Sequence, residues 1–464
     1  MTEPAFRCSG CGVALSPTRS LPRPFRCPRA VDGDGIDHVL VRVRARGVAF
    51  RPGPEANPFL RYRALSAAHG LATREGLGDA DYVALVERLD LAVAAAWGHG
   101  FRVTPLAEAP RLAEAIGGSP FELWVKDETG NVSGSHKARH LMGILVYLEV
   151  ARAMGILAGT PPKLAIASCG NAALAAAVVA RAGQRELDVF IPPDANPRVV
   201  EQLVKLGAHV EVATRTEASP AGDPCYHAFR AAIARGALPF CCQGSDNGLT
   251  IDGGETLGYE IAEGAPPLDA LFVQVGGGAL ASSVLQGLRV ARDGGAFAKL
   301  PRLYTVQTHG AHPLARAYER VAARLAARVP DAAPAGLGAR AEWLRARAAA
   351  WLDEELAYAA RHRSEFMWPW EQTPHSVAHG ILDDETYDWI ADVRGMLESG
   401  GYPLIVDEET LIRANRLARE ETGIPVDPTG SAGLAGLLEL RKTEPKLAEG
   451  RLGVIFSGID RDLA

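Results

Sequence analysis

Short apolar segments alternate with helical segments through most of this chain, and this alternation restricts its fold more than any other feature. The segment KLAIAS at 163–168 precedes the helical run NAALAAAVVARAG, and DALFVQV at 269–275 precedes GGGALASSVLQGL. The segments RLYTVQ at 302–307 and RLGVIF at 451–456 are further short apolar runs. Strands and helices that alternate at these lengths form parallel sheets covered by helices on both faces. The sequence therefore predicts an α/β fold.

The overall composition argues against several classes of protein. With 464 residues the chain is long enough for about two to four domains. A formal net charge of -6 and an isoelectric point of about 6.1 argue against a nucleic-acid binder, which needs a strongly basic face. The longest apolar run, at 172–180, is about half as long as a bilayer requires, and the first residues lack the pattern of a signal peptide. We expect a soluble, cytoplasmic protein without nucleic-acid or membrane partners.

Changes in amino-acid composition and apolar spacing along the chain predict its organisation. Residues 1–60 are rich in Pro, Gly and Arg and predict an irregular extension, whereas 79–97 has the apolar spacing of a helix. The Ala- and Arg-rich stretch at 315–365 predicts helices with a Pro/Gly interruption. We therefore expect the following parts: an N-terminal extension at 1–98, a core at 99–464, a smaller subdomain of the core at about 130–245, and an insertion at about 315–380.

Four turns rich in Gly or Ser follow predicted strands, and ligands collect at such turns in open α/β sheets. These segments are KDETGNVSGSHKARH at 126–140, ASCGNAALAAA at 167–177, VGGGAL at 275–280 and VIFSGIDRD at 454–462. Glycine-rich turns and helix N-termini present backbone N–H groups that suit a phosphate. Each turn alone is also compatible with an ordinary connection between a strand and a helix. Together they indicate one binding site built from distant segments.

Lys137, in the first of these turns, is chemically the most informative residue. A desolvated lysine loses its proton readily and can then act as an amine nucleophile. Asn171 in the second turn can both donate and accept through its amide, and the hydroxyl of Ser457 in the fourth could meet a ring nitrogen. A solvated lysine, a capping asparagine and a turn serine are the alternatives when each residue is considered singly.

Read in order, the four turns resemble the fold-type II pyridoxal-phosphate (PLP) enzymes. This group holds threonine synthase, the serine/threonine ammonia-lyases and the tryptophan synthase β chain. Its Asn-Pro-Thr-Gly-Ser-Phe-Lys-like segment is matched at 131–137, its Ser-x-Gly-Asn-x-Ala loop at 168–173, its glycine-rich loop at 276–278, and its final Ser-Gly at 457–458. The resemblance covers roughly residues 100–464 apart from the 315–380 region. It implies two open, mostly parallel sheets flanked by helices, with an irregular N-terminal extension.

The resemblance also implies roles for individual residues. Lys137 would hold PLP covalently and shuttle the Cα proton of a small amino-acid substrate. The cofactor's 3′-oxygen would bind Asn171, its phosphate would bind the backbone of Gly276, Gly277 and Gly278, and its pyridine nitrogen would lie beside Ser457. Ser133 and Ser168 would lie near the substrate carboxylate. A neutral hydroxyl beside the ring suits elimination or replacement at Cβ or Cγ. The family also implies a homodimer.

Departures from the family pattern leave several activities open. His136 stands where threonine synthases and ammonia-lyases usually have Phe, and Ala138 stands where synthases usually have Asp. The 168–173 loop lacks the glutamate that tryptophan synthase β uses on indole, so we reject that activity. A threonine synthase-like lyase is favoured, with a serine/threonine ammonia-lyase or a β-replacement synthase as alternatives. A non-catalytic PLP-fold metabolite binder is a further alternative, whereas VGGGAL lacks the G-x-G-x-x-G spacing of a Rossmann enzyme.

The N-terminal cysteines resemble the metal-knuckle extension of some threonine synthases. Cys8, Cys11 and Cys27 are thiolate ligands at a spacing that suits tetrahedral zinc, and His38 is the nearby candidate for the fourth ligand. A knuckle without metal is the alternative. We expect the remaining cysteines to be small buried residues.

Overall fold

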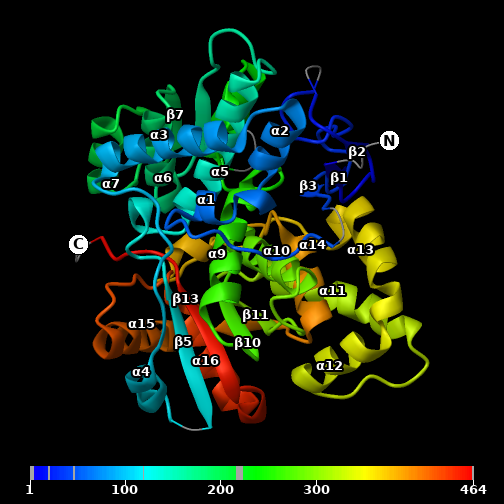
Figure 1. Ribbon diagram of the computed structural model, residues 1–464. Coiled ribbons are helices and arrows are strands. Elements are labelled where there is room, and N and C mark those ends of the chain that lie inside the picture. Colours follow the sequence, from blue (N-terminus) through cyan, green and yellow to red (C-terminus); the bar gives the residue numbers. More distant parts are fainter. Residues whose placement is uncertain (1–4, 19–20, 45–46, 119, 216–222, 462–464) are drawn as a thin grey trace.

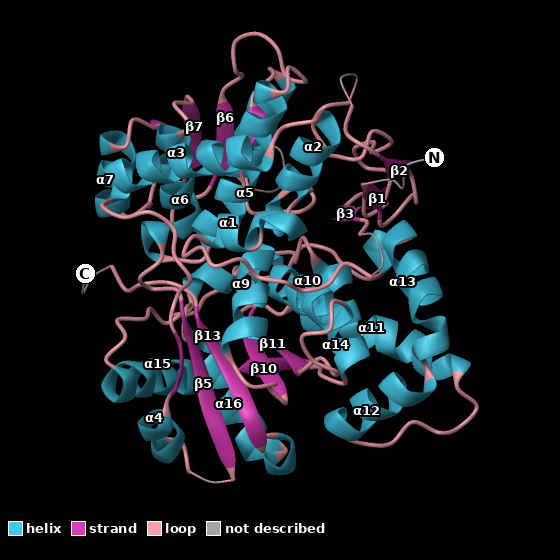
Figure 2. Ribbon diagram, in the orientation of Figure 1, coloured by secondary structure: helices cyan, strands magenta, loops and turns pink. Residues whose placement is uncertain are grey.

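The computed structural model describes residues 5–18, 21–44, 47–118, 120–215 and 223–461. Its elements form two lobes, one built on each of two mostly parallel sheets, with α9 (Thr250–Gly264) running between them (Figure 1). Helices lie around both sheets, so the layered α/β architecture expected from the sequence is present (Figure 2). The lobes matter for function because their loops meet where they adjoin.

The larger sheet has six strands in the order β12-β11-β10-β13-β5-β4. All neighbours are parallel except the edge strand β4, which is antiparallel to β5. In the register of β13 and β5, Phe456 lies opposite Asp127, so these two strands end together. The strand bounds are β4 Leu106–Glu108, β5 Phe121–Asp127, β10 Ala270–Gln274, β11 Arg302–Thr308, β12 Pro403–Val406 and β13 Gly450–Phe456.

The smaller sheet has four parallel strands in the order β8-β7-β6-β9. The strand bounds are β6 Leu164–Ala167, β7 Leu187–Ile191, β8 His209–Val212 and β9 Leu238–Pro239. The helices that belong to this lobe are α5 Lys137–Ala153, α6 Asn171–Ala182, α7 Pro197–Lys205 and α8 Pro224–Ala234. Almost every residue of α6 is buried, because this Ala- and Val-rich helix packs against α5, α3 and the sheet.

Helices surround the larger sheet on both sides. Their bounds are α4 Pro110–Ala115, α10 Ala279–Asp293, α11 Pro313–Arg328, α12 Leu337–Arg347, α13 Leu352–Arg361, α14 Trp389–Ser399, α15 Glu408–Thr422 and α16 Ala432–Thr443. The helices expected at 315–365 are therefore present as α11, α12 and α13. Helices α5 and α9 approach closely where two glycines meet, since a Cβ on Gly143 would lie 2.6 Å from Cα of Gly253.

The N-terminal part carries a small antiparallel sheet in addition to irregular chain. Its strands, in the order β2-β1-β3, are β1 Phe6–Cys8, β2 Ala14–Leu15 and β3 Leu40–Arg42. Three helices follow, α1 Pro58–Arg61, α2 Ala67–Glu75 and α3 Asp79–Trp97, the last of which was expected at 79–97. Phe6 and Leu40 share a hydrophobic core with the smaller lobe, which anchors the N-terminal sheet there.

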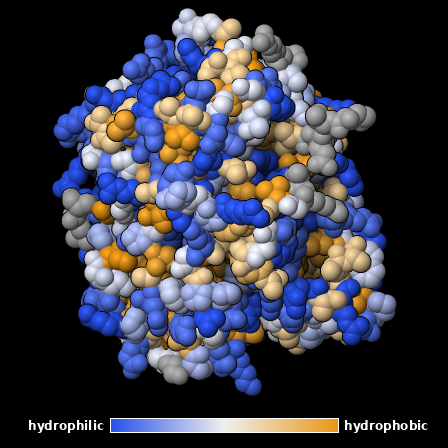
Figure 3. Space-filling model, in the orientation of Figure 1, coloured by the Kyte–Doolittle hydropathy of each residue, from blue (hydrophilic) through white to orange (hydrophobic). Residues whose placement is uncertain are grey.

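On the face shown in Figure 3, hydrophobic residues are scattered among hydrophilic ones. Within the described ranges, no helix combines the length and the apolar character that crossing a membrane would require.

Candidate active site

Three neighbouring strands of the larger sheet deliver three of the predicted turns to one edge. Strands β10, β13 and β5 are adjacent and parallel, so their carboxyl ends lie side by side. The loop after β5 (residues 128–137, the lysine loop) carries Lys137, the loop after β10 (residues 275–278, the glycine loop) opens α10, and the segment after β13 (residues 457–461, the C-terminal tail) begins with Ser457. The carboxyl edge of a parallel sheet is where open α/β proteins bind ligands.

The C-terminal tail holds the lysine loop by backbone hydrogen bonds. Ile459 N–H donates to the carbonyl of Gly134 at 2.9 Å, and His136 N–H donates to the carbonyl of Ser457 at 3.1 Å. Within the loop, Ser133 has a φ of 60°, a left-handed conformation that is uncommon for residues other than glycine. Lys137 follows as the first residue of α5 and is half-buried. Hydrogen bonds between segments more than 300 residues apart in sequence thus fix the position of Lys137 at the start of α5.

Ser457 is held by a glutamine that the sequence analysis did not single out. Gln274, the last residue of β10, donates from Nε2 to Ser457 Oγ at 2.6 Å and to the carbonyl of Gly430 at 2.8 Å. Both side chains are buried, with exposed fractions of 3% and 4%. The Ser457 hydroxyl therefore accepts from Gln274 and can turn its own O–H toward a ring nitrogen.

The smaller lobe contributes Asn171 to the same place. Asn171 is the first residue of α6, and a Cβ built on Gly458 of the C-terminal tail would lie 2.8 Å from Asn171 Nδ2. Arg461, also in the tail, donates to Asn171 Oδ1 from NH2 at 2.7 Å and from Nε at 3.2 Å. Ser168 is half-buried just after β6, in the turn that leads to Asn171. The predicted lysine, asparagine and serine loops are thus brought together at the junction of the lobes.

The glycine loop is covered by residues 381–388 (the covering segment). Thr386 Oγ1 donates to the carbonyl of Gly276 at 2.9 Å, and Asp388 N–H donates to the carbonyl of Gly277 at 3.1 Å. Gly278 has a φ of 96°, so the turn into α10 requires a residue that adopts the left-handed region without strain. The covering segment leaves little space, because a Cβ on Gly276 would meet Asp383 Oδ2. No sequence signal pointed to this contact.

Burial and the positive charge of Lys137 shape the titration of its neighbours. Burial raises the pKa of Asp383 to about 6, although Lys137 and the N–H of Gly277 act in the opposite direction. Burial, followed by the charge of Lys137, lowers the pKa of His136 well below its usual value. His136 is therefore a neutral imidazole at pH 7, with Nδ1 within 3.1 Å of the carbonyl of Ser457. One carboxyl group with a pKa close to neutral and one neutral histidine flank the lysine.

A buried network of charges braces the helix that carries Lys137. Arg139 donates to Glu128 from Nε at 2.8 Å and to Glu260 from NH1 at 2.6 Å. Lys126 donates to the same Glu260 at 2.6 Å, and all four side chains are at most 1% exposed. The network ties α5 to the end of β5 and to α9. It fixes the orientation of α5 two residues after the lysine.

Three buried polar atoms around Lys137 have no hydrogen-bond partner within the described ranges. They are the hydroxyl oxygens of Ser133 and Ser135 and Nε2 of His136. Buried polar groups in folded proteins are nearly always satisfied, and an unsatisfied one calls for an explanation such as strain, a catalytic role or a bound water, ion or ligand. These unsatisfied atoms belong to the lysine loop just before Lys137, and a ligand with polar groups bound at this loop would satisfy them.

Residues 99–458 match the family model described as pyridoxal-phosphate dependent enzyme. The chain belongs to this family. Threonine synthase of Methanocaldococcus jannaschii is 23% identical over 73% of this chain and 69% of its own length. Threonine synthase of Methanosarcina acetivorans is 27% identical over the same shares. L-serine dehydratase of Saccharomyces cerevisiae is 28% identical over 40% of this chain and 57% of its own length.

Solved structures show the same fold at lower identity. Maize serine racemase superposes with a TM-score of 0.57 at 19% identity, covering 82% of this chain and 94% of its own. A threonine deaminase from T.th. superposes with a TM-score of 0.55 at 22% identity, covering 81% of this chain and 99% of its own. Both likenesses support the two-lobed parallel-sheet architecture that the resemblance implied.

The four predicted metal ligands also lie together. One ligand atom from each of Cys8, Cys11, Cys27 and His38 lies within 4.8 Å of the others. Cys11 Sγ is 3.5 Å from Cys27 Sγ, and Cys8 Sγ is 3.4 Å from Nδ1 of His38. The other ring nitrogen of His38 lies 2.9 Å from a carboxylate oxygen of Asp34. Of the remaining cysteines, Cys225, Cys241 and Cys242 are buried as expected, but Cys169 is exposed.

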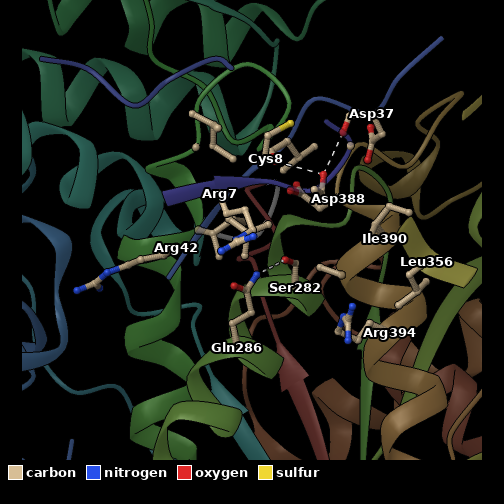
Figure 4. Close-up of a pocket in the computed structure, with 18 of the residues that line it drawn as sticks. Arg7, Cys8, Asp37, Arg42, Ser282, Gln286, Leu356, Asp388, Ile390 and Arg394 are labelled. Atoms are coloured by element: carbon tan, nitrogen blue, oxygen red, sulfur yellow. Dashed lines mark hydrogen bonds between the residues drawn. The ribbon is translucent and has the colours of Figure 1, made fainter. Parts of the chain in front are cut away.

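A separate cavity of about 770 Å³ lies between the N-terminal sheet and helices of the larger lobe (Figure 4). Arg7 points into it from β1, and Leu356, Ile390 and Arg394 line the opposite wall. None of the residues predicted to bind the cofactor lines this cavity. Asp388 lines it and also bonds to the glycine loop, so the two regions share a wall.

Proposed function

We propose that this protein is a PLP-dependent enzyme that eliminates or replaces a substituent at Cβ or Cγ of a small amino acid, in the manner of a threonine synthase. One observation carries the proposal: the cluster of unsatisfied buried polar atoms around Lys137, beside Ser457 and the asparagine of the smaller lobe. Membership of the PLP-dependent family supplies the chemical class. The threonine synthase and serine dehydratase relatives favour elimination or replacement over other reactions of the cofactor.

The residues present fit PLP. Lys137 would bind it covalently, Asn171 would donate to its ring oxygen, and Ser457 would lie beside its ring nitrogen. The backbone of Gly276, Gly277 and Gly278, at the N-terminus of α10, would hold its phosphate, since N–H groups at such a position attract anions. The Asp383 carboxylate, which contacts the N–H of Gly277 in this structure, would have to leave that position. Bound PLP serves as an electron sink that stabilises negative charge at the substrate Cα.

The chain's own side chains would bind the substrate and move protons. Lys137 Nζ would take the proton from the substrate Cα and return it, a role for which its place at the start of α5 suits it. The unsatisfied Ser133 hydroxyl and the hydroxyl of Ser168 would bind the substrate carboxylate. His136 adds no positive charge beside the lysine because burial keeps it neutral. The hydroxyl of Ser457, unlike a carboxylate, would leave the ring nitrogen without a negative partner.

A serine/threonine ammonia-lyase is the second candidate, favoured by the likeness to L-serine dehydratase. The two activities share the first steps. An ammonia-lyase then releases ammonia and a keto acid, whereas a threonine synthase-like enzyme adds a nucleophile. A β-replacement synthase is the third candidate, and a non-catalytic metabolite binder is the fourth.

The test is the absorbance spectrum of the purified protein after addition of PLP. We expect a visible band that is absent in Lys137→Ala and retained in Lys163→Ala, whose side chain is 53% exposed and lies outside the site. O-phosphohomoserine, serine and threonine are then added in turn, and the one that shifts the band and yields product identifies the substrate. A wild-type protein that keeps no such band after unbound PLP has been removed refutes the proposal.

We also propose that the N-terminal cluster holds structural zinc. Tetrahedral zinc with Zn–S bonds of about 2.3 Å places its sulfur ligands about 3.8 Å apart. The sulfur separation of 3.5 Å between Cys11 and Cys27 is close to this value, and Asp34 lies where the partner of a ligating histidine is usually found. Elemental analysis should find an equivalent of zinc that Cys11→Ser loses and Cys169→Ser keeps. Equal zinc content in the two variants would refute the site.

A homodimer and a cytoplasmic location are further parts of the proposal. Sedimentation of the purified protein measures the first, and fractionation of the source cells measures the second.

A further inference from the structure

Arg461 connects three loops of the site. Its NH2 group donates to Asn171 Oδ1 at 2.7 Å and to the carbonyl of Ser133 at 2.6 Å, and its Nε also donates to Asn171 Oδ1. The residue belongs to the C-terminal tail, which leaves β13 where the two lobes adjoin (Figure 1). One guanidinium thus contacts the lysine loop of one lobe and the first residue of α6 in the other.

The contact with Asn171 determines which end of its amide points at the site. An asparagine side chain has one acceptor end and one donor end, whereas a guanidinium has donors only. Because Arg461 occupies the oxygen, the Nδ2 donor is the end that remains on the side of Gly458. Hydrogen bonds from a charged donor are the stronger ones, so the orientation is well fixed. Without Arg461 the amide is free to rotate and to present its oxygen instead.

The contact with Ser133 supports a backbone conformation that is otherwise unfavourable. Ser133 adopts a φ of 60°, and its carbonyl accepts the shortest of the Arg461 bonds. Non-glycine residues remain in this region only when their surroundings hold them there, and such residues gather at functional sites. The same loop carries the unsatisfied hydroxyls of Ser133 and Ser135 and then Lys137.

Arg461 is half-buried and has an acidic neighbour. Burial lowers the pKa of the Arg461 guanidinium, and the nearby Asp427 carboxylate opposes this effect. The Asp427 carboxylate accepts a hydrogen bond from Gly430 N–H, and its own backbone N–H donates to the carbonyl of Gly458 in the tail. Removing part of a guanidinium from water has a cost, which the hydrogen bonds of Arg461 to Asn171 and Ser133 offset.

We propose that Arg461 is a positioning residue that sets the Asn171 amide and the lysine loop for binding PLP. The inference rests on the proposed function in that PLP is the ligand. Arg461 acts through Asn171 and Ser133 and contributes the geometry in which the Asn171 donor faces the cofactor. Neither the sequence motif nor the relatives assign this role to it.

The test is a double-mutant cycle read out as the dissociation constant for PLP, measured by titrating the cofactor-free protein. We expect Arg461→Met to weaken PLP binding by about 10- to 100-fold, the loss of a charge-assisted hydrogen bond. Arg461→Lys, which keeps the charge and one donor group, should recover part of the lost affinity for PLP. In an Asn171→Ala background, Arg461→Met should add less than about threefold, because partners that act as one unit are not additive.

A matched control uses the same tail. Arg419 lies 3.3 Å from the carboxylate of Asp460, the residue before Arg461, and contacts neither loop, so Arg419→Met should leave PLP affinity unchanged. The melting temperature of each cofactor-free variant and the pH dependence of the bound cofactor's visible band are recorded alongside. A role in folding alone would lower the melting temperature and leave the band unaltered.

The outcomes separate the two proposals. A wild-type protein that does not bind PLP refutes the proposed function. A wild-type protein that binds PLP, with an unchanged affinity in Arg461→Met or with fully additive effects in the cycle, refutes the role of Arg461 and leaves the function intact.

Discussion

Replacing Arg139 by methionine tests whether the buried charge network braces the helix that carries the lysine. Methionine keeps the unbranched apolar stem and removes the guanidinium, so the change isolates the charge. In the native protein the guanidinium contacts Glu128 and Glu260, and each carboxylate is fully buried. After the substitution Glu260 keeps Lys126 as partner. The hydrogen bonds that Glu128 keeps among the described residues come from the neutral donors Thr104 and Asn131, and Lys126 acts on it through its charge without a hydrogen bond.

The expected cost follows from the burial of the charge left behind. Removing one partner of a buried ion pair costs about 3–5 kcal/mol, because the remaining charge is neither solvated nor paired. With a shift of about 2–4 °C in the melting temperature for each kcal/mol, Arg139→Met should melt about 6–20 °C below the wild type. Arg347→Met is the control, since Arg347 and Asp331 are about 60% exposed and such pairs contribute at most about 1 kcal/mol.

The pH dependence of the difference in melting temperature identifies the Glu128 carboxylate as the cause. Burial raises the pKa of Glu128, but the charge and hydrogen bonds of Arg139 outweigh it and hold that pKa below its usual value of 4.5. This stabilisation is present above about pH 4.5 and is lost as the pH falls through the folded pKa. The difference in melting temperature between the wild type and Arg139→Met should therefore become smaller as the pH is lowered below about 4.5. Thermal melts monitored by circular dichroism measure it. If Arg139→Met melts within about 2–3 °C of the Arg347→Met control, the network is not what holds α5.

Three further predictions concern residues around the lysine and the glycine loop. Burial, and after it the charge of Lys137, lowers the pKa of His140 to about 3. Between about pH 3 and 6.5 the unfolded chain therefore binds more protons than the folded one. The free energy of unfolding should fall as the pH drops through 6.5. The stability advantage of wild type over His140→Gln, from urea unfolding, should be about 2 kcal/mol smaller at pH 5 than at pH 7.5; a constant difference would contradict a neutral buried imidazole. Gly276→Ala should raise the dissociation constant for PLP about tenfold or more, because the new methyl group meets Asp383. Gly130→Ala is the control, since a Cβ at Gly130 has open space, and this variant should bind PLP as the wild type does. Equal affinities in the two variants would contradict the close covering of the glycine loop. Gly143→Ala should lower the free energy of unfolding by about 1–3 kcal/mol, since its Cβ would lie 2.6 Å from the backbone of α9, and an unchanged value would refute this close approach.

The sequence located the parts of the site that are built from local chain. The alternation of apolar and helical segments predicted the parallel sheets, because strand and helix periodicities are properties of neighbouring residues. Lys137, Asn171, the glycine loop and Ser457 were predicted because each lies in a Gly- or Ser-rich turn after a predicted strand, and because the four turns in order resemble the fold-type II PLP enzymes. The ends of parallel strands meet at one edge of a sheet, which explains why the lysine loop, the glycine loop and Ser457 lie close together, whereas Asn171 follows a strand of the other sheet.

The remaining parts of the site depend on contacts between segments far apart in the chain. Asp383 reaches the glycine loop from about 105 residues further along, in a stretch with no glycine-rich or strand-end signal. The sequence placed Arg461 inside the SGIDRD motif, but its bond to Asn171 joins residues 290 positions apart. Strand order, register and the packing of the two lobes bring such pairs together, and none of these is encoded by local periodicity. The sequence by itself determined which chemical groups the site offers. Only the tertiary structure decided which buried charges, covering contacts and hydrogen bonds hold them, because those depend on the distances that folding creates.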